Sequence, residues 1–556
     1  MNMRTTNLQL SRPVWVLLTV IAGTVALRWP VLFSGFQSFG GDTVKWAGPA
    51  INFSQYGFSA LDYLPTTSYG LYDVELGGRS RYLTWPFPPG YMLAGFVLVF
   101  GDSSWALRSL PLLLNFTAAI YIYLIVARAF KSEWWGVLGA SCFLLIPAEL
   151  YYAMQVCDTQ FWLLGSIAGF YHMVQWYENR RRLDLIATTS WFLFACASSW
   201  FGYLATLVAV LFMLIYIFKD KPQNYWKAIL KSPIPWLVIG VIVVLSIHIT
   251  LLINALGLHG FISLYDARWQ SYTGGNIVAK NIPDASWWEG FAEAIRFRTK
   301  MIIVRSLGQQ IPLFVSLPLA VISILCAILF FVRAFMGLDR KLHRSCGAAL
   351  AFFGLFYLTY ILIFPSHMAR ATHNFTTQML APAFVVLWVY GVRWVWISLE
   401  KRQIPDSVKY VPVVILIAML LAMSINYRIE DPTLRPDGAR KRMIESARLF
   451  GTTMINETRP DDLVLSNHQG WNYDNNIMKF TARRTVTLKL FDLGKIKEYA
   501  SDPRLNGVVF VYREKRKHEP DEPFEILENY LSNAAKSIEI ITDPSAYPEL
   551  TIYRLK

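Results

Sequence analysis

About eleven stretches of apolar residues, each long enough to cross a lipid bilayer, recur along this chain of 556 residues. A helix needs about 20 apolar residues to span the ~30 Å hydrocarbon core of a membrane. The composition agrees, because 54% of the residues are hydrophobic and only 16% are charged. The chain is therefore predicted to be a polytopic α-helical membrane protein. The expected spans are approximately 14–33, 105–130, 134–156, 159–177, 185–199, 201–218, 234–256, 310–332, 347–365, 377–397 and 408–426.

One further apolar segment, residues 86–100, is barely long enough to cross. It contains Pro86, Pro88 and Pro89, and proline costs about 3 kcal/mol in a helix interior. We therefore expect it to lie at the membrane interface. The distribution of charge supports this, because the loops between spans then sort into a basic side and a side whose short loops lack Lys and Arg.

The basic loops indicate the orientation of the protein. Lys and Arg near span ends are retained in the cytoplasm, so the amino terminus and these loops are predicted to lie inside. An odd number of spans then places the carboxyl-terminal tail outside. The basic residues in question are Arg128 and Lys131; Arg180, Arg181 and Arg182; Lys219, Lys221, Lys227 and Lys231; Arg333, Arg340, Lys341 and Arg344; and Arg393, Lys401, Arg402 and Lys409.

Two domains are expected: a membrane domain at 1–426, with a first external loop at about 34–104, and an extracytoplasmic domain at 427–556. In the tail, charge rises and the apolar runs shorten to strand length. Helical periodicity is seen at 438–457, with further helical stretches near 493–500 and 521–535. The tail is therefore predicted to be a small α/β domain. Its expected strands are Leu463–Ser466, Thr485–Leu490, Gly507–Tyr512, Ser537–Ile541 and Leu550–Leu555.

Asp42 and Asp158 are the carboxylates on the external side that suggest chemistry. Asp42 follows Gly40 and Gly41, and Asp158 precedes a predicted span. Either could simply cap a helix by accepting hydrogen bonds from its first N–H groups. A carboxylate at the edge of an apolar bundle is also partly desolvated, which raises its pKa and suits a general base. Two such residues on one side form a candidate catalytic pair.

Several motifs, taken in order, resemble the GT-C membrane glycosyltransferases, in particular protein O-mannosyltransferases and the aminoarabinose transferase ArnT. Each motif is weak alone, but their order and spacing are fairly specific over the whole membrane region. They are Gly41-Asp42; Pro86-Phe87-Pro88-Pro89-Gly90-Tyr91; Gly101-Asp102 through Arg108; the turn Pro147 through Asp158; and Ser198-Ser199-Trp200-Phe201-Gly202-Tyr203.

The resemblance implies an integral membrane enzyme of a bacterial or archaeal plasma membrane. Such an enzyme moves a sugar from a polyprenyl-phosphate carrier to a lipid, glycan or protein acceptor on the extracytoplasmic face, with inversion at the anomeric carbon. By this match Asp42 is the base, or positions the acceptor. Asp158 assists acceptor binding or, as in some relatives, holds a divalent cation, which is the one cofactor that the resemblance allows.

A departing lipid phosphate needs cationic partners. The candidates are Arg79, Arg81, Arg268, Arg296, Arg298 and Arg370, which make the external side basic against its general trend. Each could instead contact lipid headgroups. ArnT-like sequences often place Lys immediately before the Pro-Pro pair. In this chain Phe87 stands at that position, before Pro88-Pro89. We therefore expect Arg79 or Arg81, with Arg370, to contact the phosphate.

Other classes of protein are also compatible with parts of the pattern. A ligase or polymerase of the O-antigen type would use Arg370 and His373 and would not need Asp42. A transporter or flippase of lipid-linked sugars would show matching halves or charged residues at mid-membrane, and the sequence shows no such halves. The basic charge carries no nucleic-acid signature. The five Cys have neither disulfide nor metal-site spacing, and no residue is assigned to a metal.

Overall fold

A computed structural model of the chain describes most of the membrane region and the secondary structure of the tail. The described residues are 11–32, 41–59, 63–64, 86–273, 287–338, 340–365, 371–430, 458–459, 462–466, 484–487, 493–503, 505–513, 522–534, 536–541 and 550–555.

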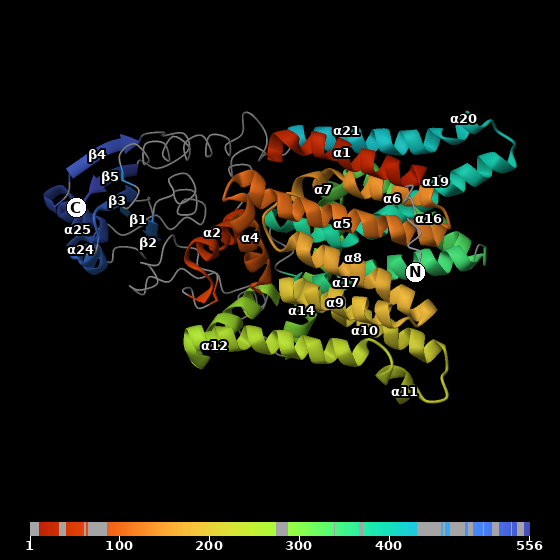
Figure 1. Cartoon of the computed structure of the whole chain (residues 1–556), viewed down its shortest axis with the longest axis horizontal. Helices are drawn as coiled ribbons and strands as arrows, with labels where there is room; N and C mark the ends of the chain where they lie inside the picture. The colour runs from red at the N-terminus through yellow and green to blue at the C-terminus, as the bar shows by residue number, and fades with distance from the viewer. Residues whose placement is uncertain are drawn as a thin grey trace, which may run out of the picture.

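Long helices lying roughly side by side form one bundle, and a small sheet lies beyond one end of it (Figure 1). The long helices are α1 (Arg12–Leu32), α5 (Ser104–Phe130), α8 (Thr159–Asn179), α9 (Arg182–Ser198), α10 (Trp200–Lys219), α12 (Ile234–Thr273), α16 (Leu317–Phe335), α17 (Arg340–Ile363), α19 (Ala381–Lys401) and α21 (Val411–Glu430). The shorter ones are α2 (Gly41–Tyr56), α4 (Pro88–Phe100), α6 (Glu133–Leu144), α7 (Pro147–Tyr152), α11 (Tyr225–Leu230), α14 (Trp287–Lys300), the π-helical η3 (Met301–Gln310), α15 (Ile311–Val315), the 3₁₀-helical η4 (Ala371–Leu380) and α20 (Asp406–Lys409).

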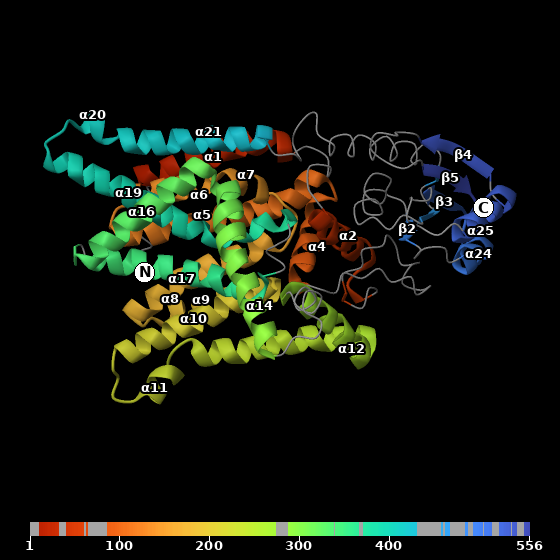
Figure 2. The ribbon, with the colours of Figure 1, turned by 180° about the vertical axis from the view of Figure 1, so that it is seen from behind.

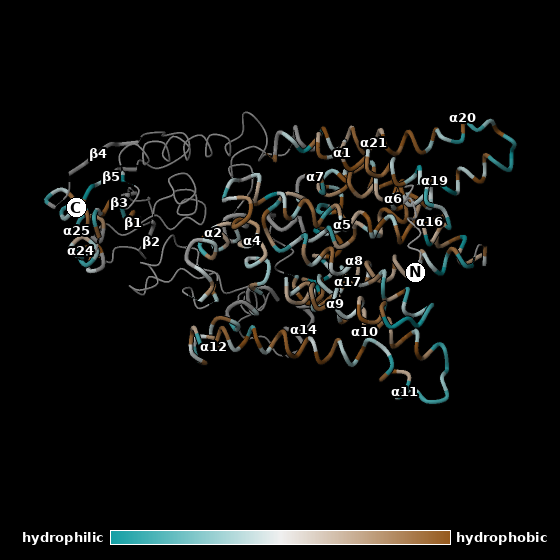
Figure 3. The backbone as a smooth tube through the Cα atoms, in the orientation of Figure 1, coloured by the Kyte–Doolittle hydropathy of each residue, from teal (hydrophilic) through white to brown (hydrophobic). Residues whose placement is uncertain are grey.

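Eight of the described helices are long and apolar enough to cross a membrane, so the predicted polytopic helical membrane fold is confirmed. Hydrophobic residues extend along the length of the long helices of the bundle (Figure 3). The remaining three of the eleven expected spans correspond to α6 with α7, to α8 and to α9. Helix α8 buries 14 of its 21 residues, and a helix surrounded by protein needs fewer apolar side chains than one facing lipid.

Two expected spans are not continuous helices. The span predicted at 134–156 divides where α6 ends at Leu144 and α7 begins at Pro147. Proline lacks the N–H that would continue the helical ladder, which favours a break there. The span predicted at 310–332 divides at Ser316, which has a φ of 76° and separates α15 from α16.

The apolar segment after Pro86 forms α4, which lies across the direction of the long helices at one end of the bundle (Figure 1). At about 1.5 Å per residue, its 13 residues extend only about 20 Å, less than the hydrocarbon thickness. The expectation that this segment does not cross the membrane therefore agrees with its length and direction. It packs against α2, and we call this end of the bundle the α2–α4 end.

The basic connections meet at the opposite end, which we call the basic end. The turns after α5, α8, α10, α16 and α19 lie there, near the labels α11 and α20 in Figures 1 and 2. The Lys and Arg residues on which the predicted orientation rests lie in these turns or in the helices that flank them. The predicted orientation, with the basic end in the cytoplasm and the α2–α4 end outside, stays a prediction of the positive-inside rule.

The tail forms a mixed five-stranded sheet in the order β2-β1-β3-β5-β4. Strands β1 (Leu463–Ser466), β2 (Arg484–Thr487) and β3 (Val508–Arg513) are parallel, and β5 (Leu550–Arg554) pairs antiparallel with β3 and with β4 (Lys536–Ile541). Helices α24 (Leu493–Ser501) and α25 (Glu522–Ala534) share a core with alternate residues of β1 and β3. The predicted α/β tail is thus confirmed, although the helix expected at 438–457 lies outside the described residues and the division at residue 427 stays a prediction.

Candidate active site

Asp42 is the second residue of α2, so its backbone lies in the first turn of a helix at the α2–α4 end. Its side chain lies outside the described residues. Helix α2 is held against α4 by an aromatic cluster, in which the Phe53, Phe58 and Tyr91 ring centroids are 5.0 to 5.3 Å apart. This packing fixes the position of the helix that carries the first candidate carboxylate.

Tyr91 also ties α4 to the first external loop. Its hydroxyl donates a hydrogen bond to the carbonyl of Tyr63 over 2.5 Å. Burial, with a smaller effect of the Tyr63 hydroxyl, raises the pKa of Tyr91, so the phenol remains a neutral donor. The part of the first external loop that follows α2 is therefore attached to α4. This attachment limits the movement of α2 relative to the bundle.

Asp158 is buried, with 5% of its surface exposed, at the start of α8. Its side chain makes no capping hydrogen bond to that helix, so helix capping does not account for its presence. The α8 start lies at the same end of the bundle as α2, because α5 runs to the basic end and α6 returns from it. The structure thus brings the Asp42 backbone and Asp158 to one end, as the charge pattern predicts.

A buried network that the sequence analysis missed holds the loop carrying Asp158. Asn115 donates from its amide nitrogen to Glu149 Oε1 over 2.5 Å and to Gln160 Oε1 over 3.2 Å. Gln160 donates to Glu149 Oε1 over 3.2 Å and to the Tyr152 carbonyl over 3.4 Å. Because Tyr152 precedes this loop and Gln160 follows it, the network closes residues 153–158 at their base.

Two buried arginines join the same end of the bundle. Arg28 donates from Nη2 to the Leu144 carbonyl over 3.3 Å, and its charge acts on Glu149. Arg108 donates from Nη1 to the Leu32 carbonyl over 3.3 Å. A charged side chain in an apolar span is costly and marks function or a specific partner, and this signal could have singled out both residues in the sequence.

The predicted phosphate-binding arginines are only partly described. Arg79, Arg81 and Arg370 lie outside the described residues, and so does the side chain of Arg268, although its backbone belongs to α12. Arg296 is 78% exposed and pairs with Glu293 over 2.8 Å. Arg298 donates from Nε to the Leu362 carbonyl over 3.0 Å, which ties α14 to the end of α17. A phosphate-binding role for all six stays a prediction.

The described residues can be searched for a group of side chains that could hold a metal ion. Within them, no group of three or more His, Cys, Asp or Glu side chains is placed to hold a metal ion. His367 and the side chains of Asp42 and His373 lie outside this part of the chain, and a divalent cation held by Asp158 stays a prediction.

Comparison with known proteins agrees with this architecture. Residues 85–253 match the family model described as dolichyl-phosphate-mannose-protein mannosyltransferase. This segment begins just before α4 and includes Asp158 and the buried network. No curated protein sequence matches the chain.

The fold is that of two solved membrane transferases. ArnT from Cupriavidus metallidurans, in the structure bound to undecaprenyl phosphate, aligns over 98% of this chain and 99% of its own, with a TM-score of 0.57 and 12% identity. The chain has the GT-C fold. The archaeal oligosaccharyltransferase AglB from Archaeoglobus fulgidus, in complex with an inhibitory peptide and a dolichol-phosphate, aligns over 90% of this chain and 69% of its own, with a TM-score of 0.53 and 10% identity. The GT-C resemblance expected from the sequence motifs is therefore confirmed.

Proposed function

We propose that this protein is a membrane glycosyltransferase that takes a sugar from a polyprenyl-phosphate donor and transfers it to an acceptor hydroxyl or amine on the extracytoplasmic face. The observation that carries the proposal is the alignment with ArnT bound to undecaprenyl phosphate, which extends over nearly the whole of both chains. The match of residues 85–253 to a mannosyltransferase family model supports a sugar as the transferred group.

Residues at the α2–α4 end would act in a glycosyl transfer by single displacement. Asp42 takes the proton from the acceptor while the acceptor oxygen or nitrogen bonds to the anomeric carbon. The bond from that carbon to the phosphate oxygen breaks, its electron pair stays on the phosphate, and the configuration inverts. Asp158 positions the acceptor, and a buried carboxylate suits this role because its acceptor strength is not lost to water.

The polyprenyl phosphate leaves as an anion, so arginines near the reaction centre lower the energy of the transition state. Arg79, Arg81 and Arg370 are our candidates for this contact. The positions of Arg296 and Arg298 suit them less well, because Arg296 already pairs with Glu293 and Arg298 with a carbonyl. Neither the ligase-like nor the transporter hypothesis is favoured by an observation on the described residues.

Native mass spectrometry of the full-length protein, purified in detergent, tests the donor class. We expect a copurified polyprenyl phosphate or its glycoside, and saturable binding of added undecaprenyl phosphate. Binding of a free sugar with no affinity for the lipid phosphate would contradict the proposal.

Transfer itself is tested by release of polyprenyl phosphate from a polyprenyl-phosphate sugar fraction, with the protein in liposomes. Asp42→Asn is expected to lower the rate by about 100-fold or more while the protein remains folded, because the base is lost. Asp102→Asn is the matched control, since Asp102 is an exposed carboxylate after α4. Full activity of Asp42→Asn, together with loss at His373→Ala, would favour the ligase-like hypothesis instead.

A further inference from the structure

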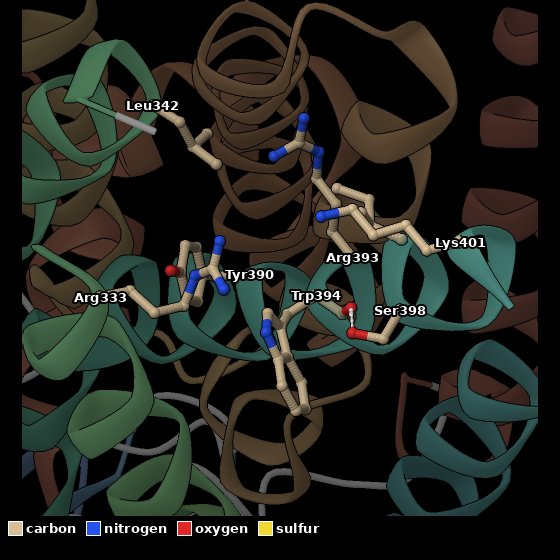
Figure 4. A pocket seen from close by; sticks show the side chains of 8 residues that line it. Arg333, Leu342, Tyr390, Arg393, Trp394, Ser398 and Lys401 are labelled. Atoms are coloured by element: carbon tan, nitrogen blue, oxygen red, sulfur yellow. Dashed lines mark hydrogen bonds between the residues drawn. The ribbon is translucent and has the colours of Figure 1, made fainter. Parts of the chain in front are cut away.

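A hollow at the basic end of the bundle is lined by three cationic side chains (Figure 4). Arg333 comes from the last turn of α16, and Arg393 and Lys401 come from α19. The volume of the hollow is about 50 Å³, which exceeds the roughly 10–15 Å³ that one water molecule needs. None of the described residues that line it is Asp or Glu. The remaining lining residues are Leu342, Tyr390, Trp394, Ile397 and Ser398.

Three side chains that carry positive charge line this one hollow. In Figure 4 the Lys401 side chain extends toward the stem of Arg393, whose guanidinium is turned away from the ammonium, and Arg333 lies on the other side, beside Tyr390. Like charges repel more strongly beside low-dielectric protein than in open water. An anion between them converts this repulsion into attraction, so the arrangement favours an anionic ligand.

Contacts of Tyr390 and Arg393 connect the hollow to neighbouring helices. The Tyr390 hydroxyl and His343 Nε2 are hydrogen-bonded over 2.9 Å, which joins α19 to α17. The Phe330 ring of α16 packs on both, with centroids 4.9 Å from His343 and 5.2 Å from Tyr390. The Arg393 guanidinium lies 5.6 Å from the centroid of the Phe130 ring. These contacts hold α16, α17 and α19 together beside the hollow.

The surroundings indicate a lipid as the source of the anion. On α16, Phe331 and Phe335 are 65% and 95% exposed on either side of Arg333, as expected for side chains that face acyl chains. Trp394 in the lining is 37% exposed, and tryptophan favours the level of the lipid headgroups. Basic hollows between membrane helices on the cytoplasmic side bind acidic headgroups.

We propose that the hollow formed by Arg333, Arg393 and Lys401 binds the phosphate of an anionic phospholipid in the membrane leaflet at the basic end. The basic end is opposite to the α2–α4 end, so this site is separate from the one proposed for sugar transfer. It concerns binding alone and does not depend on the proposed reaction.

The test measures binding of phosphatidylglycerol to the full-length protein in detergent by native mass spectrometry and by the shift in Tm on titration. We expect saturable binding of phosphatidylglycerol and none of phosphatidylethanolamine, which carries no net charge. The variant Arg333→Gln, Arg393→Gln, Lys401→Gln is expected to lose this binding, with each single change weakening it by roughly fivefold. The single changes also serve if the triple variant does not fold.

The matched control is the variant Arg181→Gln, Arg182→Gln, Lys227→Gln. It also removes two Arg charges and one Lys charge, but from exposed positions at the same end. It is expected to bind phosphatidylglycerol like the unmodified protein. Equal loss in both triple variants would show a diffuse effect of charge and would overturn the proposal. A shift of the same size with inorganic phosphate, at the same concentration, would overturn the assignment to a lipid.

Discussion

Glu149 is an acidic side chain at the centre of a buried network between four helices. It is fully buried, accepts hydrogen bonds from Asn115 and Gln160, and lies within the field of the Arg28 guanidinium. Buried charges persist in proteins when they are paired and hydrogen-bonded, because removal of one partner leaves the other uncompensated. The network therefore stabilises the fold and also holds the loop that carries Asp158.

Replacement of Glu149 by Ala is expected to destabilise the protein by about 3 kcal/mol or more, because the Arg28 charge loses its nearby carboxylate and two buried amide groups lose one of their acceptors. Glu149→Gln keeps an acceptor oxygen and the shape of the side chain, so its effect is expected to be smaller. The measurement is thermal unfolding in detergent. Glu178→Ala is the control, since Glu178 pairs with Arg128 at a site where its side chain is 48% exposed, and such pairs contribute about 1 kcal/mol or less. Equal losses in Glu149→Ala and Glu178→Ala would contradict the role of the network.

Single residues also show how far sequence reasoning reaches. Asp158 was identifiable because an isolated carboxylate follows an apolar stretch. Arg28 was visible as a charge near a span end, but its relation to Glu149 was not, since the two are distant in the chain and meet only when α1 packs beside α6. Asn115 and Gln160 carry no charge, so nothing in their local sequence marked them.

The pair α9 and α10 illustrates how packing of two helices depends on one small residue. A Cβ added at Gly202 would overlap the backbone of Ala195 and Cys196, so the helices can approach this closely only with glycine there. Small residues at such crossings are the usual solution in membranes. The close contact sets the direction in which the chain leaves the turn at Ser199, whose side-chain oxygen accepts a hydrogen bond from the Phe201 amide.

Gly202→Ala is expected to lower stability by about 3 kcal/mol, at the upper end of overpacking costs, because backbone must move to accommodate the methyl group. The control is Gly95→Ala in α4, where a Cβ would meet nothing within 4 Å. That change is expected to be neutral or to stabilise by up to about 1 kcal/mol, as alanine favours helix. Thermal unfolding of both variants checks this, and a loss in Gly95→Ala as large as in Gly202→Ala would disprove the explanation.

At the level of the complete chain, the two ends of the bundle differ in chemistry. The basic connections gather at one end, and α2, α4 and the buried Asp158 lie toward the other. The tail sheet lies beyond the α2–α4 end in Figures 1 and 2. If the basic end faces the cytoplasm, the α2–α4 end and the tail sheet lie outside the cell.

Labelling with a membrane-impermeant maleimide tests this orientation. Asp102→Cys, after α4, and Ser501→Cys, in the tail, are expected to react in intact cells. Lys221→Cys, at the basic end, is expected to react only after permeabilisation. The unmodified chain is the control, since four of its five Cys are buried and Cys326 is half-buried within α16. Reaction of Lys221→Cys alone in intact cells would reverse the orientation, and with it the proposed side of catalysis.

The membrane fold and the tail strands followed from local composition. An apolar stretch of about 20 residues has few alternatives to a membrane helix, and short alternating runs favour strands, so both could be inferred without knowledge of contacts. The charge of the loops likewise predicts an orientation. Each of these properties belongs to a continuous piece of chain and needs no partner from elsewhere.

Contacts between distant segments could be known only from the folded chain. The network around Glu149, the Gly202 contact and the hollow formed by Arg333, Arg393 and Lys401 each join residues from separate helices. Which faces of neighbouring helices meet depends on how all of them pack together, and no window of sequence contains that information. The composition of each helix therefore specified that it enters the membrane, whereas the packing of the whole bundle specified which polar groups it brings together there.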